Sequence, residues 1–392
     1  MRNEVSPLTD REAALLVHRA GGTPLYVYSR QAMREAVRRV RAASVPDADI
    51  YYSLKANPHV GVAGFLSTLV DGFDVCSLAE METALNAGMP PERVLFTGPA
   101  KTHQEAVAAL AAGVAVTIES PGQSRLFAKV ATELGVAGRA VVRLNTPYPG
   151  KSADAPTSPN QFGLSTEVFA EVVRILAASP LSLIGLHMFW GSQYSDAGVI
   201  AAARRAALER AQALSTRFGL AFEFLAIGGG IAMPWCDADP PVDWEGLKAA
   251  GLTPGGPGIG GSATVVCEYG RAIAGPAGSL LTTVLDTKTI GDRRYVLVDA
   301  GMNHVLIASR LVAGAGRGEP SVRVVNPGSP DVTSRTTVTG PLCSQLDVLA
   351  EDVLLPAVAV GDTLVFSGMG AYGPTFSPGG FLSRDQVREV VF

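Results

Sequence analysis

Residues 94–144 read VLFTGPAKTHQEAVAALAAGVAVTIESPGQSRLFAKVATELGVAGRAVVRL, and their pattern predicts the fold of the larger part of the chain. The apolar runs VLF, VAVTI and AVVRL are predicted strands, because buried parallel strands read as short continuous apolar runs. The two stretches between them are predicted helices, and each is followed by a glycine that is typical of a helix end. Strands and helices in regular alternation predict a parallel sheet.

The same alternation extends from about residue 24 to residue 270. The other predicted strands of this region are 51–54, 73–75, 183–186, 222–227 and 264–267, and its other predicted helices are 79–87, 169–178, 201–218 and one that begins near residue 60. Seven or eight such units fit a (β/α)8 TIM barrel, which we expect over residues 31–265. The pattern alone leaves a doubly wound open sheet as the alternative.

After residue 265 the sequence becomes β-rich, with Gly, Pro and Asp turns and little helical periodicity. The predicted strands are Ser279–Leu285, Tyr295–Val298, Val322–Val325, Thr336–Thr339 and Thr363–Phe366. We therefore expect a C-terminal all-β domain over residues 266–392, joined by residues 1–30 through the strand-like run Thr23–Tyr28. Two long segments are predicted loops: Thr146–Asn160 at the rim of the barrel, and the glycine-rich Pro254–Gly261.

The composition is that of a compact globular protein. Hydrophobic residues make up 47% of the chain, charged residues 17%, and the net charge is −4. These values exclude a disordered chain and argue against a nucleic-acid-binding protein. The four cysteines and five histidines lack the spacing of metal ligands, so we expect no metal site. The sequence shows neither a secretory signal nor a stretch able to span a membrane, and we expect a cytoplasmic protein.

Four short motifs contain residues that could carry chemistry. Lys55 follows the first predicted barrel strand, where a partly desolvated amine can form a Schiff base. A surface lysine that caps the strand is the alternative interpretation. Gly228–Gly230 could bring backbone amides close to an anion, or could form only a tight turn. Glu268 and Arg271 could bind a pyridine nitrogen and a phosphate, or form a surface ion pair. Cys343 could be an acid or a nucleophile if it is exposed in a cleft, or a small buried apolar residue.

In this order the motifs resemble those of the fold-type III, pyridoxal 5'-phosphate (PLP)-dependent decarboxylases. This group includes diaminopimelate, ornithine and arginine decarboxylases, with alanine racemase as a more distant relative. The resemblance covers almost the whole chain, and it rests on residues 52–57, 73–80, 187–193, 228–230, 268–271, 299–303, 340–347 and 370–372. It implies an alanine racemase-like PLP-binding barrel followed by a β domain, which is the order expected from the pattern.

The resemblance also implies roles for individual residues. Lys55 matches the Schiff-base lysine, Glu268 the carboxylate beside the pyridinium nitrogen, and Cys343 the residue that reprotonates the α-carbon. The other positions matching the cofactor site are Asp74, His187, Phe189, Ser192, Gly228, Gly229, Gly230, Gly270, Arg271 and Tyr372. In this family the cysteine reaches the site of the other subunit, so a homodimer is implied.

The chain departs from the family pattern in the part that recognises the substrate. Phe189 stands where a histidine stacks on the cofactor ring, and Tyr269 replaces a proline. Ser344 replaces the acidic residue after the cysteine, and the Arg-Pro…Tyr pair after residue 303 is absent. A pocket without its acidic group loses the charge-assisted contact to a substrate's distal ammonium. Arg310 is available for an anionic group of the substrate, or is an exposed solubilising charge.

These departures lead us to expect decarboxylation of a conjugated or carrier-protein-tethered amino acid in a biosynthetic pathway, with an acyl-carrier protein as a possible partner. Decarboxylation of a free diamino acid (diaminopimelate, ornithine or lysine) is the alternative. A PLP-dependent racemase or a non-catalytic PLP-binding protein is also compatible with the fold, but Cys343 argues against both.

Overall fold

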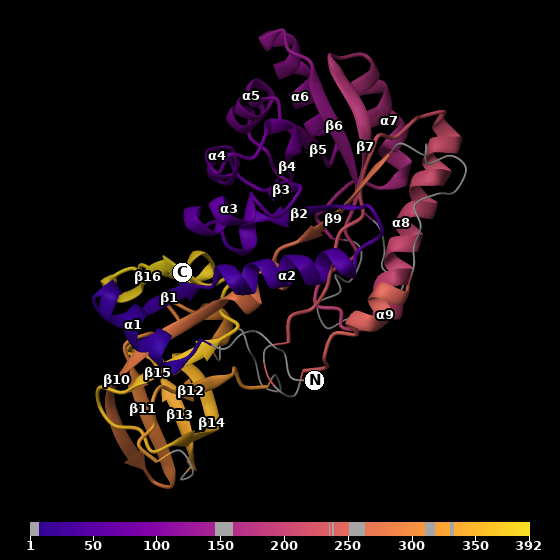
Figure 1. The fold of residues 1–392 in the computed structure, drawn as a ribbon. Coiled ribbons are helices and arrows are strands. Elements are labelled where there is room, and N and C mark those ends of the chain that lie inside the picture. Colours follow the sequence, from indigo (N-terminus) through magenta and orange to yellow (C-terminus); the bar gives the residue numbers. More distant parts are fainter. Residues whose placement is uncertain are drawn as a thin grey trace. The chain divides into compact units, whose positions relative to one another are not determined.

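A computed structural model describes residues 8–145, 160–234, 236, 239–250, 263–309, 318–329 and 333–392 (Figure 1). The predicted loop at 254–261, Arg310 and nearly all of the predicted loop at 146–160 lie outside these residues. The chain divides into two compact units. The barrel unit comprises Val37–Ala232 and Val242–Gly270, and the β unit comprises Met1–Ala36, Met233–Pro241 and Arg271–Phe392.

Eight parallel strands form a closed barrel in the barrel unit. They are β2 (Asp49–Ser53), β3 (Gly72–Val75), β4 (Val94–Phe96), β5 (Ala115–Ile118), β6 (Gly138–Leu144), β7 (Leu181–Met188), β8 (Phe224–Ala226) and β9 (Thr264–Tyr269). The ring closes where β2 pairs with β9, with Tyr51 opposite Glu268. This closure confirms the predicted TIM barrel and excludes the doubly wound sheet. The predicted domain boundary at residue 265 falls within β9.

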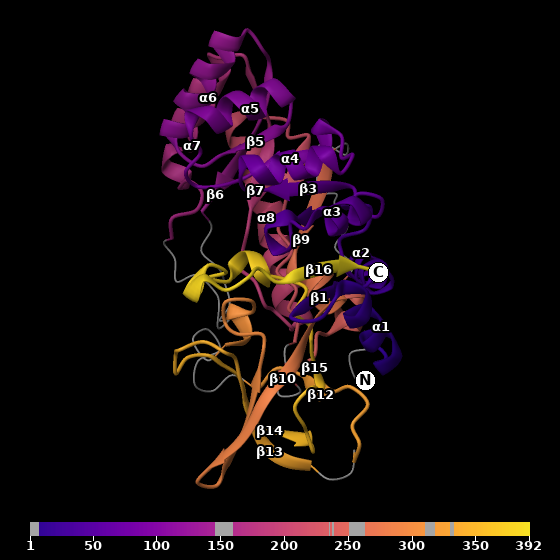
Figure 2. The same cartoon turned by 90° about the vertical axis from the view of Figure 1, so that its left-hand side faces the viewer.

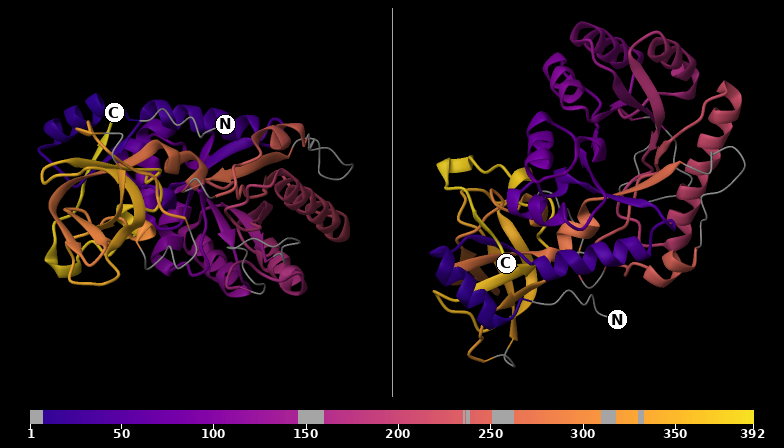
Figure 3. Two further views of the ribbon diagram at one scale, coloured as in Figure 1. Left: turned by 90° about the horizontal axis from the view of Figure 1, so that it is seen from below. Right: turned by 45° about the horizontal axis from the view of Figure 1, so that its top comes forward.

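Helices follow the strands on the outside of the barrel (Figure 3). They are α2 (Arg30–Ala42, before β2), α3 (Val60–Leu66), α4 (Leu78–Asn86), α5 (His103–Ala112), α6 (Pro121–Leu134), α7 (Thr166–Ala177), α8 (Ala197–Phe218) and α9 (Trp244–Ala249). Local sequence sets their ends: Thr102 and Glu105 form a capping box at the start of α5, and Gly113 ends it in the left-handed conformation.

Apolar side chains from several strands pack together inside the barrel. Tyr51, Leu95, Ala115, Val141, Ala226 and Val266 form one buried cluster. A barrel interior filled in this way is a packed core and not a pore. Polar chemistry is therefore confined to the strand ends, and the carboxyl ends are where TIM barrels carry their active sites.

The β unit is built on one long strand, β10 (Gly278–Ile290), labelled in Figure 2. The other strands are β1 (Leu25–Tyr28), β11 (Arg293–Val298), β12 (Val322–Val324), β13 (Thr333–Thr339), β14 (Val348–Pro356), β15 (Thr363–Ser367) and β16 (Arg388–Val391). The first half of β10 pairs with β1 and β15, and its second half pairs with β11 after a bulge near Leu285. The N-terminal run therefore joins the C-terminal sheet through β1.

Two helices and several turns complete this unit. Helix α1 (Asp10–Ala20) packs Ala13 and Leu16 on Leu25 and Leu281 of the sheet, and the short α10 (Arg271–Ala274) begins the third segment of the unit. Single 3-10 turns of this unit lie at 275–277, 306–308, 374–376 and 381–383, and two more lie in the barrel unit at 54–56 and 91–93. Among the described residues, no helix is long and apolar enough to cross a membrane.

Candidate active site

Lys55 lies at the carboxyl end of β2, in the 3-10 turn Leu54–Ala56. Its Nζ is 3.7 Å from Oδ2 of Asp74 on β3, and the lysine side chain is half exposed whereas Asp74 is buried. Gly270 permits this turn to lie against the end of β9, since a Cβ there would come within 2.8 Å of Cβ of Ala56. The lysine thus presents an accessible amine beside a buried carboxylate.

The environment of Asp74 works against its ionisation. Burial raises the pKa of this carboxyl group above its usual value, and the charge of Glu268 adds to the rise, while Lys55 and the Thr97 hydroxyl oppose it. Thr97 donates a hydrogen bond of 2.7 Å to Oδ1 of Asp74. The ammonium group of Lys55 therefore favours the charged form of Asp74 against the effect of burial.

His187 on β7 and Glu268 on β9 form a buried pair. Nε2 of His187 lies 3.0 Å from Oε2 of Glu268, and both side chains are about 95% buried. Burial opposes ionisation of Glu268, but its charge and hydrogen-bond interactions with His187, with help from Lys55 and Arg143, hold its pKa below the ordinary value. The second oxygen of Glu268, Oε1, is buried and has no hydrogen-bond partner among the described residues.

This orphaned oxygen fits the cofactor that the sequence implies. A carboxylate held in its charged form can accept a hydrogen bond from a protonated ring nitrogen, and that contact would satisfy an acceptor that is otherwise costly to bury. The residues present in the barrel therefore fit a pyridine ring beside Glu268.

Gly228–Gly230 follow β8 and form a turn in which side chains have no room. A Cβ on Gly229 would come within 2.0 Å of the Glu268 carbonyl oxygen, and one on Gly230 within 2.8 Å of the Gly191 carbonyl oxygen. Gly228 and Gly230 also have φ near +70°, which favours glycine. Such a turn brings backbone amides close to an anion, as phosphate binding requires.

Phe189 and Ser192 lie on the loop after β7, next to this turn. The ring of Phe189 would be 3.2 Å from a Cβ on Gly228, and its side chain is 36% exposed. Ser192 is half-buried, one residue after Gly191. The structure therefore brings the predicted stacking residue and the predicted phosphate-binding glycines together.

Two further predicted cofactor residues, Arg271 and Tyr372, are neighbours within the β unit. The guanidinium carbon of Arg271, at the start of α10, is 4.5 Å from the centroid of the Tyr372 ring. Tyr372 has a positive φ of 54°, which is uncommon outside glycine and holds its ring at this place. The stacking restricts the orientation of the guanidinium.

Cys343 and Ser344 lie on the loop between β13 and β14, where Cys343 is exposed. The buried carboxylate of Asp347 holds this loop by accepting hydrogen bonds from the backbone amides of Leu342 (2.8 Å) and Met302 (2.6 Å). Asp347 therefore fixes the turn that presents the cysteine. Its role was not predicted from the sequence, because the two amides it binds are 5 and 45 residues away.

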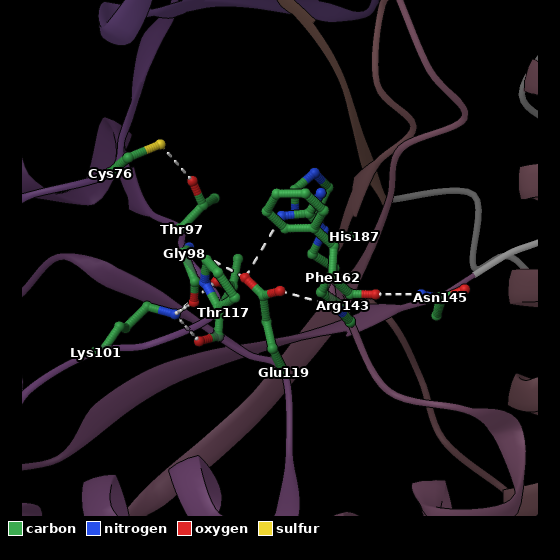
Figure 4. A network of polar contacts seen from close by, with 12 residues as sticks. Cys76, Thr97, Gly98, Lys101, Thr117, Glu119, Arg143, Asn145, Phe162 and His187 are labelled. Atoms are coloured by element: carbon green, nitrogen blue, oxygen red, sulfur yellow. Dashed lines mark hydrogen bonds and ion pairs between the residues drawn. The ribbon is translucent and has the colours of Figure 1, made fainter. Parts of the chain in front are cut away.

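A second network at the carboxyl ends of the barrel strands was also missed (Figure 4). Glu119, just after β5, lies 3.5 Å from Arg143 of β6 and accepts hydrogen bonds from the amides of Gly98 (3.1 Å) and Gly163 (2.8 Å). The Arg143 guanidinium lies over the Phe162 ring at 4.7 Å. Although burial opposes its ionisation, the Arg143 charge and these contacts hold the pKa of Glu119 below its ordinary value. The signal in the sequence was a charged residue at a strand end.

Lys101 belongs to the same network, after β4. Its Nζ donates hydrogen bonds to the carbonyl oxygens of Gly98 (2.7 Å) and Thr117 (2.8 Å). Burial lowers the pKa of Lys101 to about 8, against the opposing charge of Glu119. Among the described residues, no group of histidine, cysteine and acidic side chains could hold a metal ion.

The chain is similar to known proteins along most of its length. The pyridoxal binding domain of the pyridoxal-dependent decarboxylases matches residues 30–275. The chain is 30% identical to the diaminopimelate decarboxylase of Helicobacter pylori, over 94% of this chain and 90% of that protein. It is 33% identical to the diaminopimelate decarboxylase of Pseudomonas aeruginosa, over 94% and 88%.

Two further similarities were found. The chain is 26% identical to the L-glutamyl-[BtrI acyl-carrier protein] decarboxylase of Niallia circulans, over 94% of this chain and 88% of that protein. The crystal structure of the Helicobacter pylori diaminopimelate decarboxylase complexed with L-lysine superimposes with a TM-score of 0.85 at 27% identity, covering 97% of this chain and 94% of that one.

Proposed function

We propose a substrate class for this chain, which belongs to the pyridoxal-dependent decarboxylases and is a PLP-dependent amino-acid decarboxylase by family and fold. The proposed reaction removes the α-carboxylate of a free diamino acid, with diaminopimelate as the first candidate. The observation that supports this proposal most is the 30–33% identity to diaminopimelate decarboxylases over more than nine-tenths of the chain. The similarity therefore favours the free-substrate alternative over the conjugated substrate that Ser344 led us to expect.

Different residues of the barrel would perform different roles in such a site. Lys55 would hold the cofactor through its amine, Gly228–Gly230 would bind its phosphate, and Phe189 would pack on its ring. Bound PLP supplies an electron sink for the pair released when the bond to the carboxylate breaks. Glu268, kept ionised by His187, would hold the ring nitrogen protonated, which strengthens that sink.

Cys343 would return a proton to the α-carbon after carbon dioxide leaves. Its exposure allows it to reach a substrate, and the backbone contacts of Asp347 hold its loop in one conformation. A positioned thiol group can act as such a proton donor.

A carrier-tethered amino acid is the second candidate, and Ser344 is the observation that favours it. A serine cannot form the ion pair with a distal ammonium that an acidic residue forms, and the 26%-identical relative acts on a carrier-bound glutamyl group by its name.

A substrate panel separates the two candidates. Carbon dioxide release is measured from meso-diaminopimelate, lysine and ornithine, and from glutamyl- and lysyl-loaded acyl-carrier proteins, with the Lys55→Ala variant as the blank. Turnover of a free diamino acid at least tenfold faster than of any loaded carrier supports the proposal. Preference for a loaded carrier contradicts it and selects the second candidate.

We also propose a homodimer in which Cys343 serves the site of the partner subunit. The exposed apolar side chains Leu346, Phe376 and Phe381 belong to the same unit as the exposed Cys343, and aromatic residues are enriched in protein interfaces. Mixing the inactive variants Lys55→Ala and Cys343→Ala tests this arrangement: mixed dimers recover activity only if the two residues of one site come from different chains. No recovery after verified subunit exchange contradicts it.

A further inference from the structure

A cavity of about 140 Å³ lies in the barrel unit near the amino end of β2, away from the carboxyl ends that carry the site above. The end of α2, the turn before β2, α8 and α9 line it. Its main lining residues are Arg41, Ser44, Pro46, Arg204, Leu247 and Lys248. Three of the described lining residues are cationic and none of them is acidic.

Arg204 is the buried cation of this cavity. Its side chain is 3% exposed, and its Nη1 and Nη2 donate hydrogen bonds of 2.8 Å to the Ala43 carbonyl oxygen and the Tyr269 hydroxyl, both neutral acceptors. No carboxylate forms an ion pair with Arg204 in the described part of the chain, and its buried Nε–H has no acceptor there. Residues 251–262, which follow α9, contain no Asp or Glu in their sequence.

The other two cations already have counter-charges. Arg41 pairs with Asp71 at 2.9 Å, and Lys248 pairs with Glu245 at 2.6 Å. Arg204 thus carries a charge that its described protein surroundings do not neutralise. A buried charge is costly unless it is paired, and a buried N–H without an acceptor adds to that cost.

We propose that this cavity binds a small oxyanion, of the carboxylate or phosphate class, as the counterion of Arg204. A cavity of this volume has room for several water molecules and therefore for such an ion. An oxyanion in the cavity would supply the missing negative charge beside the Arg204 guanidinium, and guanidinium groups bind these anions strongly. The half-exposed Arg41 and Lys248 add positive potential at the same cavity.

The anion site also bears on the structure of β9. Arg204 holds the hydroxyl of Tyr269, which Ser44 also contacts at 2.8 Å. Tyr269 follows Glu268 and its ring would lie 2.7 Å from a Cβ on Gly229. An anion that fixes Arg204 therefore stabilises the folded barrel at the strand that carries Glu268.

The test uses the PLP-saturated enzyme, so that phosphate cannot enter an empty cofactor site. Inorganic phosphate is titrated at constant ionic strength in an amine chloride buffer, and binding is followed by calorimetry and by the melting temperature. We expect saturable binding of one phosphate per chain and a melting temperature that rises with phosphate concentration, because a ligand of the native state alone stabilises it. A parallel titration with acetate distinguishes phosphate from carboxylate recognition.

Arg204→Met should weaken the binding at least tenfold, whereas Arg205→Met, at an exposed position of the same helix, should leave it unchanged. Should Arg204→Met fail to fold, Lys248→Met provides the second variant, with an expected weakening of about threefold. The proposal is overturned if neither anion stabilises the wild type beyond the chloride control, or if both variants at the cavity respond as the wild type does.

Discussion

The residues proposed to hold the cofactor, in the barrel unit, differ in burial and pairing from the residues proposed to meet the substrate, in the β unit. In the barrel unit, Glu268 and Asp74 are buried and each has a specific partner, His187 and Lys55 respectively. In the β unit, Cys343 is exposed and its neighbour Ser344 has no charge. The residues proposed to hold the cofactor thus include two buried carboxylates with specific partners, whereas the residues proposed to meet the substrate lie on an exposed loop where substitutions would not disturb the core.

Apart from the inactive Lys55→Ala and Cys343→Ala variants, we expect the largest loss of activity from a change in the buried His187–Glu268 pair. Glu268→Gln keeps the shape of the side chain but removes its charge, so it can no longer hold a ring nitrogen protonated. We expect kcat to fall by roughly 10²-fold, the size of effect seen when one preorganised electrostatic contact is removed. Steady-state kinetics with the substrate found in the panel measures this loss, and Glu245→Gln, an exposed position, is the control. A kcat within twofold of the wild type would contradict the role of Glu268.

The next effect concerns the loop in the β unit. Asp347→Ala removes the carboxylate that binds the amides of Leu342 and Met302, which loosens the turn carrying Cys343. We expect kcat to fall by about tenfold, since misplacing a reacting group costs rate, while the absorption spectrum of bound PLP stays unchanged. Asp352→Ala, in an exposed ion pair, is the matched control. Equal loss in both variants, or an altered PLP spectrum, would show that Asp347 does not act through the Cys343 loop.

Glu119→Gln should lower stability more than activity. The carboxylate of Glu119 pairs with the largely buried Arg143, and its loss leaves that charge uncompensated. We expect the free energy of unfolding at pH 7 to fall by about 2 kcal/mol. Urea denaturation at pH 7 measures it, with Glu133→Gln on the surface as the control.

The same variant has a predicted pH dependence. The pKa of Glu119 is lower in the folded than in the unfolded protein, so its stabilising contribution is fully present above the unfolded value near 4.5. The contribution is lost as the pH falls below that value and through the folded pKa. The stability difference between wild type and Glu119→Gln should therefore shrink in acid, and a difference independent of pH would refute the charge interaction.

The smallest effect is expected at Phe189. Phe189→His introduces the residue that the resemblance places at the stacking position, and both rings can pack on a pyridine. We expect the affinity for PLP to change by no more than about threefold. Titration of the cofactor-free protein with PLP measures it. A loss of tenfold or more would indicate that the pocket beside Gly228 is adapted to phenylalanine.

Much of the fold could be read from the sequence, because the barrel strands and helices have a strong local pattern. The repeat in 94–144 and the glycines after its helices predicted the elements between β4 and β6. Strand β14 was missed because Glu351 and Asp352 interrupt its apolar residues. Helices α1 and α2 and strand β16 near the chain ends were also not predicted.

Residues of the candidate site could be named from the sequence where a residue type implies its chemistry or where a position matches a motif of the family. Lys55, Glu268 and Gly228–Gly230 could be named for that reason. The pairing of His187 with Glu268 could not, because the two are 81 residues apart and meet only when the barrel closes. Glu119, Arg143 and Lys101 read as ordinary charged residues, and their burial is a property of the folded barrel alone.

The most direct test of the central claim, that the paired groups of the barrel hold PLP for decarboxylation, is made on one preparation of purified protein with added PLP. The absorption spectrum and the release of carbon dioxide from the substrate panel are recorded for the wild type and for Lys55→Ala, with Lys129→Ala as the surface control. We predict a band at about 420 nm and carbon dioxide release in the wild type and the control, and neither in Lys55→Ala. An unchanged band and unchanged release in Lys55→Ala would contradict the account.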